Sequence, residues 1–584
     1  MPRTFALPLR IGPLALLLAA QASAAQPAFT ALDAVQAEWD RRPPVFTVTE
    51  RDALPPADRQ RLELSLRRIA GPGAPGLLPA ELEQPTLPVW EAKALAARTP
   101  QERFTALFLL NRLKSTKALS ALAGLGKEDA RSWPRHLHLE GQLAVARLNG
   151  GAISTELQGF LDALQAAGKT DGVRSGAARL RLVLAGQQPG TAALTAPIRL
   201  AALDAWNRGP WPIRSSIHLA LLDKTFAGNL ATGDPGLAQR LLEGLPADPI
   251  PAGLQAALRA LDAGTDPLVR LGALDYLQKL PDLDAPARAA VSKAALANDR
   301  APLWPGYLTL LRKYQVEAAD ALDNRLLAGA DPLARAAALD DLPKPPEDME
   351  ALLKRLWSPA EYDGVQTLVA ALDRWKLPEP QRRTVLARLL EHPCWTARQD
   401  AYRLLVKIDP STPWPQVPAP LPAEAAILQE ARRLAAAARP VRLKIQFEHN
   451  RQVTLRLDPV NAPINVANLE LLARSGFFDR HRVPRVVPDF VVQMGSPVDT
   501  MDGGPGYTVR CEDSLDWYGP GSVGIALSGK DTGGSQFFIT TNAAPHLTGR
   551  YTRVGVLEDP DQALPLLDQL ELGARILKVE VLAR

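Results

Sequence analysis

A helical pattern repeated about every 32 residues constrains the fold of this chain more than any other feature. The segment from Asp266 to Leu277 reads DPLVRLGALDYL, and the segment from Asp331 to Leu342 reads DPLARAAALDDL. Similar breaks recur at intervals of 32, 32, 33, 27 and 34 residues, at Asp234, Asp266, Asn298, Asp331, Ser358 and His392. Self-similarity at a fixed period indicates stacked units, because one unit cannot bury its apolar face alone.

The residues at these breaks predict helix starts. An Asp side chain accepts hydrogen bonds from the first free N–H groups of a helix, and a Pro in the first turn loses no hydrogen bond. After Asp266, one apolar stripe follows at helical spacing, formed by Val269, Gly272, Ala273, Tyr276, Leu277 and Leu280. Neighbouring units are therefore expected to cover this stripe.

This pattern resembles HEAT-like helical repeats, whose helix pairs open with an Asp-Pro turn and carry an arginine in the first helix. The resemblance is clearest over residues 232–408 and implies an α-solenoid there. Residues 25–231 share only the Ala-, Leu- and Arg-rich composition, so a helical region with degenerate repeats is expected. Because only two units match closely, an irregular helical bundle is the alternative.

The character of the sequence changes after residue 408. Residues 409–439 hold a proline-rich linker and then a predicted helix over 423–438; the prolines are Pro413, Pro415, Pro418, Pro420 and Pro422. Apolar and polar residues alternate over 441–448 and 453–457, as they do in half-buried strands. We therefore expect a separate β-rich domain over 440–584.

The first 24 residues have the pattern of a secretory signal peptide. Arg3 and Arg10 precede an apolar run over 11–20, and Ala22-Ser23-Ala24 supplies small residues for a cleavage site. The run is shorter than the ~20 residues that a membrane-spanning helix needs, so cleavage after Ala24 is favoured over a membrane anchor. The sequence thus predicts a periplasmic protein with no membrane span after signal removal.

Several ligand classes are disfavoured. Lys and Arg exceed Asp and Glu by only 67 − 63 = 4 residues, which gives no electrostatic case for nucleic acid. The GxxxxGK pattern over 524–530 is followed by Asp531, where a nucleotide-binding loop needs Ser or Thr. The seven histidines are scattered, so no metal or other cofactor is expected. Cys394 and Cys511 fall in different predicted domains, and two free thiols are favoured over a disulfide.

Six C-terminal segments resemble the cyclophilin-type peptidyl-prolyl isomerases, in order and at the family's spacing. They are APINVAN at 462–468, SGFFD at 475–479, RVVPDFVVQ at 485–493, GGPGY at 503–507, GSQFFIT at 534–540 and PHLTG at 545–549. The resemblance covers residues 440–584 and implies an eight-stranded closed β-barrel with two helices. It also implies a cofactor-free peptidyl-prolyl cis-trans isomerase (EC 5.2.1.8) that acts on proline-containing unfolded or partner polypeptides.

The chemistry of that reaction indicates one catalytic residue. Rotation about a peptide bond is opposed by ~18–20 kcal/mol because the nitrogen lone pair is delocalised. A guanidinium that hydrogen-bonds this lone pair stabilises the twisted transition state more than the planar ground state. By resemblance, Arg485 takes this role. The substrate-binding residues that the resemblance predicts are Phe490, Val491, Gln493, Ala526, Leu527, Gln536, Phe538, His546, Leu547 and Tyr551.

The C-terminal part also departs from the family pattern. Val483-Pro484 stands where the family has Phe-His ahead of the catalytic arginine, and Leu527 stands where many members have Asn. His546 and Tyr551 replace a frequent Trp and a frequent His. Three functions therefore stay open. The first is an exported isomerase whose helical repeats bind clients or partners, and the second is a non-catalytic peptide- or protein-binding scaffold with a degenerate site. The third is a structural scaffold formed by the solenoid alone.

Overall fold

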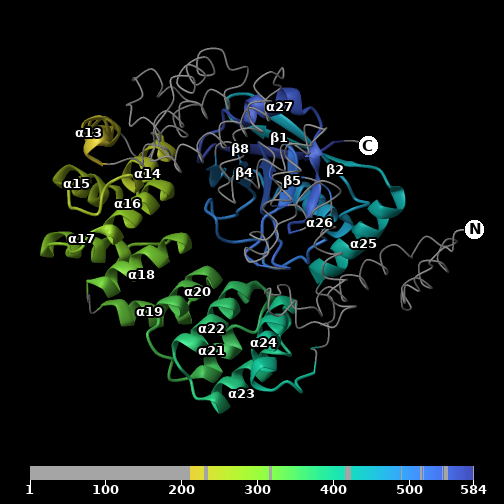
Figure 1. The fold of residues 1–584 in the computed structure, drawn as a ribbon, viewed down its shortest axis with the longest axis horizontal. Helices are drawn as coiled ribbons and strands as arrows, with labels where there is room; N and C mark the ends of the chain where they lie inside the picture. The colour runs from red at the N-terminus through yellow and green to blue at the C-terminus, as the bar shows by residue number, and fades with distance from the viewer. Residues whose placement is uncertain are drawn as a thin grey trace, which may run out of the picture.

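The computed structural model describes residues 211–228, 234–314, 318–413, 415, 422–487, 490–512, 516, 518–529, 531–541, 544, 547 and 550–582. The predicted signal peptide at 1–24 and most of the predicted helical region at 25–231 lie outside the described residues. In the described part, an array of helices is followed by a β-rich part, and the array curves around one side of it (Figure 1).

The array has two layers of helices. Its described helices are α13 (Trp211–Ala227), α14 (Pro235–Glu243), α15 (Pro251–Ala260), α16 (Pro267–Lys279), α17 (Ala285–Leu296), α18 (Trp304–Lys313), α19 (Ala318–Ala328), α20 (Pro332–Asp341), α21 (Met349–Arg355), α22 (Tyr362–Arg374), α23 (Glu379–Leu389) and α24 (Trp395–Ile408). Helices α14, α16, α18, α20, α22 and α24 pack on one another in succession. Helices α15, α17, α19 and α23 each pack against the helix that follows, on the outer side of the curve.

Each predicted break lies just before a helix of the inner layer. The Oδ1 atoms of Asp234, Asp266 and Asp331 accept hydrogen bonds from the first-turn N–H groups of α14, α16 and α20, at 2.9 to 3.0 Å. This capping is the reason that the sequence period marks the helix starts. The prediction of short helices that begin at these breaks is confirmed over 234–408, and the HEAT-like assignment stays a prediction.

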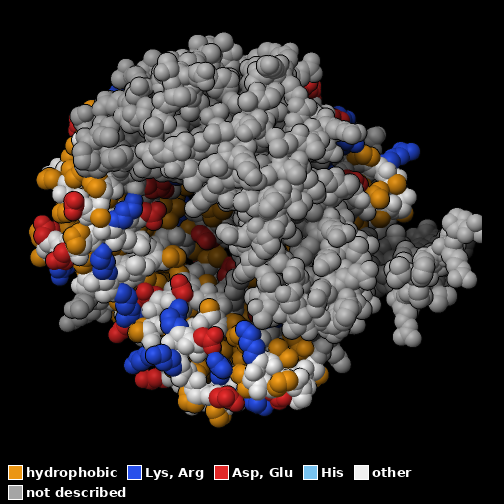
Figure 2. All heavy atoms as spheres, viewed as in Figure 1, with side chains coloured by type: hydrophobic (Ala, Val, Ile, Leu, Met, Phe, Trp, Pro, Cys, Tyr) orange, Lys and Arg blue, Asp and Glu red, His pale blue; other side chains and the backbone are white. Residues whose placement is uncertain are grey.

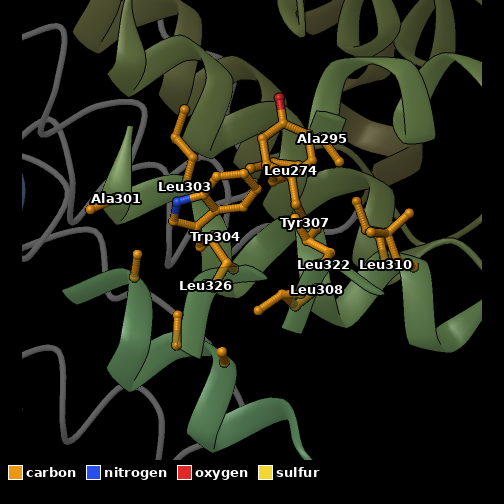
Figure 3. Close-up of a cluster of buried hydrophobic side chains, with 14 of the residues drawn as sticks. Leu274, Ala295, Ala301, Leu303, Trp304, Tyr307, Leu308, Leu310, Leu322 and Leu326 are labelled. Atoms are coloured by element: carbon orange, nitrogen blue, oxygen red, sulfur yellow. The ribbon is translucent and has the colours of Figure 1, made fainter. Parts of the chain in front are cut away.

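The core of the array lies between its two layers. Figure 3 shows one part of it, where Trp304 and Tyr307 of α18 lie among leucines from neighbouring helices. Leu274 comes from α16, and Leu322 and Leu326 come from α19. On the face of the array that Figure 2 shows, Lys and Arg side chains are mixed with Asp and Glu and with hydrophobic side chains. The large apolar side chains of the stripes are buried between the layers.

The arginine of the repeat pattern links one unit to the next. Arg270 Nη2 donates to Asn298 Oδ1 and to the Tyr307 hydroxyl, both at 3.1 Å. Arg335 donates to Glu361 through two parallel hydrogen bonds of 3.0 and 3.1 Å. Both arginines are buried. In both of the units that match closely in sequence, the arginine therefore hydrogen-bonds to a residue at the start of the following unit.

Replacing Arg335 by Ala should strongly destabilise the array, because Glu361 would stay buried without its partner. Removing one member of a buried ion pair costs about 3–5 kcal/mol of unfolding free energy. The matched control is Arg374→Ala, which breaks the exposed contact to Asp340 and should cost less than about 1 kcal/mol. Denaturant unfolding followed by circular dichroism measures both, and equal losses in the two variants would contradict the assigned role of Arg335.

The β-domain, here residues 422–582, contains one eight-stranded antiparallel sheet. Its strands are β1 (Val441–Phe447), β2 (Arg451–Leu457), β3 (Arg485–Val487), β4 (Val491–Met494), β5 (Ser522–Ile525), β6 (Phe537–Thr540), β7 (Arg553–Leu557) and β8 (Ile576–Val581), and they pair in the order β3-β4-β6-β5-β7-β2-β1-β8. The alternation predicted over 441–448 is visible in β1, where every second side chain is buried.

The sheet differs from the predicted closed barrel in how its edges meet. Strands β3 and β8 lie at opposite ends of the strand order and form no ladder with each other. The irregular segment before β3 instead bonds the turn before β8: Val483 N donates to Ala574 O, and Gly573 N donates to Val483 O, each at 2.9 Å. The strand number thus agrees with the prediction, whereas a continuous closing ladder is absent from the described residues.

Three helices accompany the sheet. They are α25 (Pro422–Ala437), α26 (Pro463–Arg474) and α27 (Pro560–Leu567), and the last two are the helices that the resemblance implies. Helix α25 packs on α26 and buries Ile427, Ala431 and Leu434 in the same core as the sheet. The helix predicted within the linker is therefore part of the β-domain, which begins before residue 440.

A buried carboxylate anchors the N-terminus of α26. Glu512 accepts hydrogen bonds from Ile464 N at 3.0 Å, Asn465 N at 2.9 Å and Asn465 Nδ2 at 2.8 Å. Burial raises the pKa of Glu512 to about 7, although these donors favour the charged form. The folded state therefore binds more protons than the unfolded state between about pH 4.5 and 7.

This linkage predicts that Glu512 makes the β-domain less stable as the pH rises from 4.5 towards 7. Relative to Glu512→Gln, which does not titrate, the wild type should lose on the order of 2 kcal/mol of unfolding free energy across that window. Calorimetric unfolding of both chains at several pH values gives the difference. A difference that is constant with pH would show that Glu512 has the same pKa in both states.

The array contacts the β-domain at several places, two of which involve α16 and α24. Near the start of α16, Asp266 forms an ion pair with Arg482, and Leu268 packs on Leu572. At α24, Gln399 Nε2 donates to Asp531 Oδ2 at 3.4 Å. Two segments of the array far apart in sequence thus hold the β-domain within the curve (Figure 1).

Cys394 and Cys511 are both buried and neither forms a disulfide bond, as the sequence favoured. None of the helices in the described part of the chain is long and apolar enough to cross a membrane.

Candidate active site

Strands β3, β4 and β6 bring the predicted catalytic arginine next to two glutamines. In the antiparallel register, Arg485 lies opposite Gln493, so their side chains can meet on one face of the sheet. Arg485 Nη1 donates to Gln493 Oε1 at 3.2 Å, and Gln493 Nε2 donates to Gln536 Oε1 at 3.0 Å. Three residues that the sequence places in two separate motifs therefore form one polar chain.

The far end of this polar chain is fixed by a loop. Gln536 Nε2 donates to the carbonyl oxygens of Met501 and Gly503, at 3.0 and 2.9 Å. Gly503 has a φ of 78°, a conformation that glycine adopts without strain. The loop thus orients Gln536, which orients Gln493 and, through it, the guanidinium of Arg485.

The guanidinium of Arg485 is partly buried beside an aromatic ring. Its Cζ lies 5.9 Å from the centroid of the Phe490 ring. Burial lowers the pKa of Arg485 from its usual value, and the guanidinium still carries its charge because arginine does not deprotonate in proteins. Electrostatic interactions are stronger in such a partly desolvated setting than in water.

An apolar pocket adjoins the arginine. Six of the predicted substrate-binding residues belong to its single side-chain cluster: Phe490, Val491, Ala526, Phe538, Leu547 and Tyr551. The Phe538 and Tyr551 rings meet edge to face, with centroids 5.8 Å apart. The structure therefore gathers residues from four segments into one aromatic-walled socket, which can bury an apolar ring without hydrogen bonds.

Sequence reasoning missed two residues that shape this socket. Tyr518 is fully buried, stacks on Phe538 with centroids 5.9 Å apart, and donates its hydroxyl to Tyr551 O at 3.2 Å. Gly524 lies beneath Phe538, and a Cβ there would be 2.4 Å from Phe538 Cζ. Tyr518 belongs to no periodic pattern or motif, and Gly524 appears only in the GxxxxGK pattern over 524–530, which gives no sign of its contact with Phe538.

Other predicted substrate-binding residues follow β5 or lie outside the described residues. Ala526 and Leu527 follow β5, and Ala526 N donates to Gln536 O at 3.0 Å. His546 lies outside the described residues. Pro484, the departure beside the catalytic position, leaves Arg485 as the first residue of β3. The roles of these residues in substrate binding stay predictions.

Asp531, which stands where a nucleotide-binding loop needs Ser or Thr, makes structural contacts instead. Asp531 is buried, accepts a hydrogen bond from Cys511 N at 2.8 Å and contacts Gln399 of the array. No group of three or more His, Cys, Asp or Glu residues that could hold a metal ion occurs among the described residues.

A cavity of about 920 Å³ lies between the β-domain and the array. On one side it is lined by Gln493, Gln536, Ala526, Leu527 and the loop 501–508. On the other side it is lined by residues of α20 and α22. The polar chain of the active site therefore opens into a space that the array partly encloses.

This arrangement can catalyse rotation about a prolyl peptide bond. A proline ring in the apolar socket would place its amide nitrogen within the region that Arg485 flanks. The oriented guanidinium can donate to the nitrogen as it becomes pyramidal, and no proton transfer is required. The polar chain supplies the preorganisation that such electrostatic stabilisation needs.

A family model and two relatives in sequence agree with this chemistry. The family model described as cyclophilin type peptidyl-prolyl cis-trans isomerase/CLD matches residues 442–580. A peptidyl-prolyl cis-trans isomerase of Synechococcus elongatus is 42% identical over 121 residues, which are 21% of this chain and 83% of that protein. Peptidyl-prolyl cis-trans isomerase B of Bacillus subtilis is 46% identical over 111 residues, which are 19% of this chain and 78% of that protein. A crystal structure of a cyclophilin type isomerase of Cryptosporidium parvum aligns with 23% identity and a TM-score of 0.23, and covers 25% of this chain and 99% of that one.

Proposed function

Because the chain belongs to the cyclophilin-type peptidyl-prolyl cis-trans isomerase family through residues 442–580, we propose that it is an exported folding enzyme whose helical array holds the polypeptide being isomerised. The catalysed reaction is peptidyl-prolyl cis-trans isomerisation (EC 5.2.1.8), and its substrates are proline-containing polypeptides. Export to the periplasm is supported by the pattern of residues 1–24, with Arg3 and Arg10 ahead of a short apolar run.

One observation carries the choice of an enzyme over a binding scaffold. The polar chain from Arg485 through Gln493 to Gln536 is complete and adjoins the aromatic socket. A degenerate site would have no need for a guanidinium held by two glutamines and a loop. The replacements at Leu527 and Tyr551 leave both residues packed in or beside the site.

The proposed role of the array follows from the shared cavity. A polypeptide that extends beyond the socket along Ala526 and Leu527 enters the space lined by α20 and α22. The array would thus contact the residues that flank the proline. HEAT-like repeats, which the pattern over 232–408 resembles, offer such a curved inner face.

Refolding of a protein whose slow phase is limited by proline isomerisation tests the proposal. The wild-type chain should accelerate that phase, whereas a scaffold would bind the unfolded protein without accelerating it. A photo-crosslinking residue at Thr367, which lines the cavity, should capture the unfolded protein. The same residue at Arg382, in the outer helix α23, serves as the control, and equal capture at both positions would count against the array's role.

Export has its own test. The full chain, produced in a bacterial host, should be recovered from the periplasmic fraction with Ala25 as its first residue, as intact mass measures. Recovery of the uncleaved chain in the cytoplasm would contradict the export proposal without affecting the isomerase.

A further inference from the structure

Four carboxylates line the cavity between the array and the β-domain. They are Asp331, Asp340, Asp363 and Asp502. Among the described residues that line this cavity there is no Lys, Arg or His. The cavity wall is therefore acidic, although the chain as a whole has a slight excess of basic residues.

Two of these carboxylates are already engaged. Asp331 caps α20 through Leu333 N and Ala334 N. Asp340 pairs with Arg374 at 3.0 Å on the exposed surface. Neither is therefore available as a full negative charge for a ligand.

The other two carboxylates line the cavity from its two sides, Asp363 from the array and Asp502 from the β-domain. Asp363 lies in the first turn of α22, and Asp502 lies in the loop that anchors Gln536. Burial raises the pKa of Asp363, and the charge of Asp502 raises it further. Desolvation likewise raises the pKa of Asp502. Within the described part of the chain, neither aspartate forms an ion pair, so a cation between them would relieve an existing repulsion.

The position of this pair relative to the active site points to its ligand. The backbone of Asp502 belongs to the loop whose carbonyl groups hold Gln536, and Gln536 lines the same cavity. Ala526 and Leu527, which are predicted to hold the peptide, line it as well. A polypeptide whose proline occupies the socket thus brings a residue on one side of the proline near Asp363 and Asp502.

We propose that Asp363 of the array and Asp502 of the β-domain form a subsite for a Lys or Arg side chain near the isomerised proline. The inference rests on the proposed function, because it assigns a charge preference to the same substrate groove. It gives the array a direct part in substrate selection, since one of the two carboxylates comes from α22. The selected substrates are basic, proline-containing unfolded segments.

A peptide series tests this subsite with the full chain. Each peptide contains one proline and a Lys at successive positions on either side of it, and its partner peptide has Gln at the same position. The ratio of kcat/KM for the Lys peptide to that for the Gln peptide should reach about fivefold at one or two positions on one side, the size of a partly screened ion pair. High salt should reduce this ratio.

Two substitutions identify the carboxylates responsible. Asp363→Asn and Asp502→Asn should each lower the Lys-to-Gln ratio towards one at the preferred position. Asp373→Asn, at the other end of α22 and in an exposed pair with Arg382, should keep the wild-type ratio. Thermal unfolding of each variant checks that the fold is intact. If one Asn variant does not fold, the other still tests the subsite.

The outcomes separate this inference from the proposed function. An active wild type with Lys-to-Gln ratios near one at every position overturns the subsite and leaves the isomerase standing. A preference for Lys that survives both Asn variants also overturns it. A wild type that turns over none of the peptides overturns the proposed function and the subsite together.

Discussion

Replacing Arg485 by Ala should lower kcat/KM for a proline peptide by about 10²–10³-fold, the loss that follows removal of one preorganised donor to a transition state. The guanidinium is the only charged group in the polar chain formed with Gln493 and Gln536. Its removal leaves the aromatic socket intact, so peptide binding should persist. A protease-coupled assay of cis-to-trans conversion measures the rate, and a peptide titration measures the affinity.

Two further variants sharpen this result. Arg485→Lys keeps the charge but loses the planar, multi-donor guanidinium, so it should recover only part of the activity. Arg456→Ala removes an exposed arginine from β2 and should leave the rate unchanged. If Arg485→Ala retained wild-type activity, the catalytic role assigned to Arg485 would be wrong, whereas a wild-type chain without activity that still binds peptide would favour the scaffold interpretation.

The second large effect concerns the extent of the β-domain. A fragment of residues 440–584 should be less stable than a fragment of residues 422–584 by about 3 kcal/mol, which is about 10 °C in Tm for a domain of this size. The longer fragment keeps α25, whose Ile427 and Leu434 are buried against α26. Burial of each such side chain contributes about 1.5–3 kcal/mol, and the ordering of the helix offsets part of it.

Point substitutions within α25 separate packing from chain length. In the 422–584 fragment, Leu434→Ala should cost about 2–5 kcal/mol. Gln429→Ala, at an exposed position of the same helix, should stay within about 0.5 kcal/mol of the parent. Equal Tm values for the two fragments would show that α25 does not stabilise the β-domain and belongs to the linker.

The sequence predicted the local elements well where one residue type has one physical role. Asp234, Asp266 and Asp331 mark helix starts because a side-chain oxygen satisfies N–H groups that no helix can satisfy internally. The alternation over 441–448 predicted β1 because one face of the sheet is buried. The helix predicted over 423–438 was placed within the linker, whereas it packs in the core of the β-domain, since its apolar face does not say which surface will cover it.

The active site was predictable only in part. The motif around Arg485 and the motif around Gln536 could be recognised because their spacing is similar to that of a known family. The roles of Tyr518 and Gly524 could not be found, since both act through contact with Phe538, which no local sequence pattern reports. The partial closure of the sheet could not be derived either, because irregular backbone bonds such as those of Val483 leave no periodic trace.

What the sequence determined by itself was the list of parts: capped helices at a fixed period, an alternating β-rich segment, and residues typical of prolyl isomerisation. What only the tertiary structure decided was which parts face each other. Asp363 and Asp502 are 139 positions apart (502 − 363), yet they line one cavity, because the array meets the β-domain at both α16 and α24. The physical reason is that caps and periodicity act between near neighbours along the chain, whereas a shared cavity depends on packing between distant surfaces.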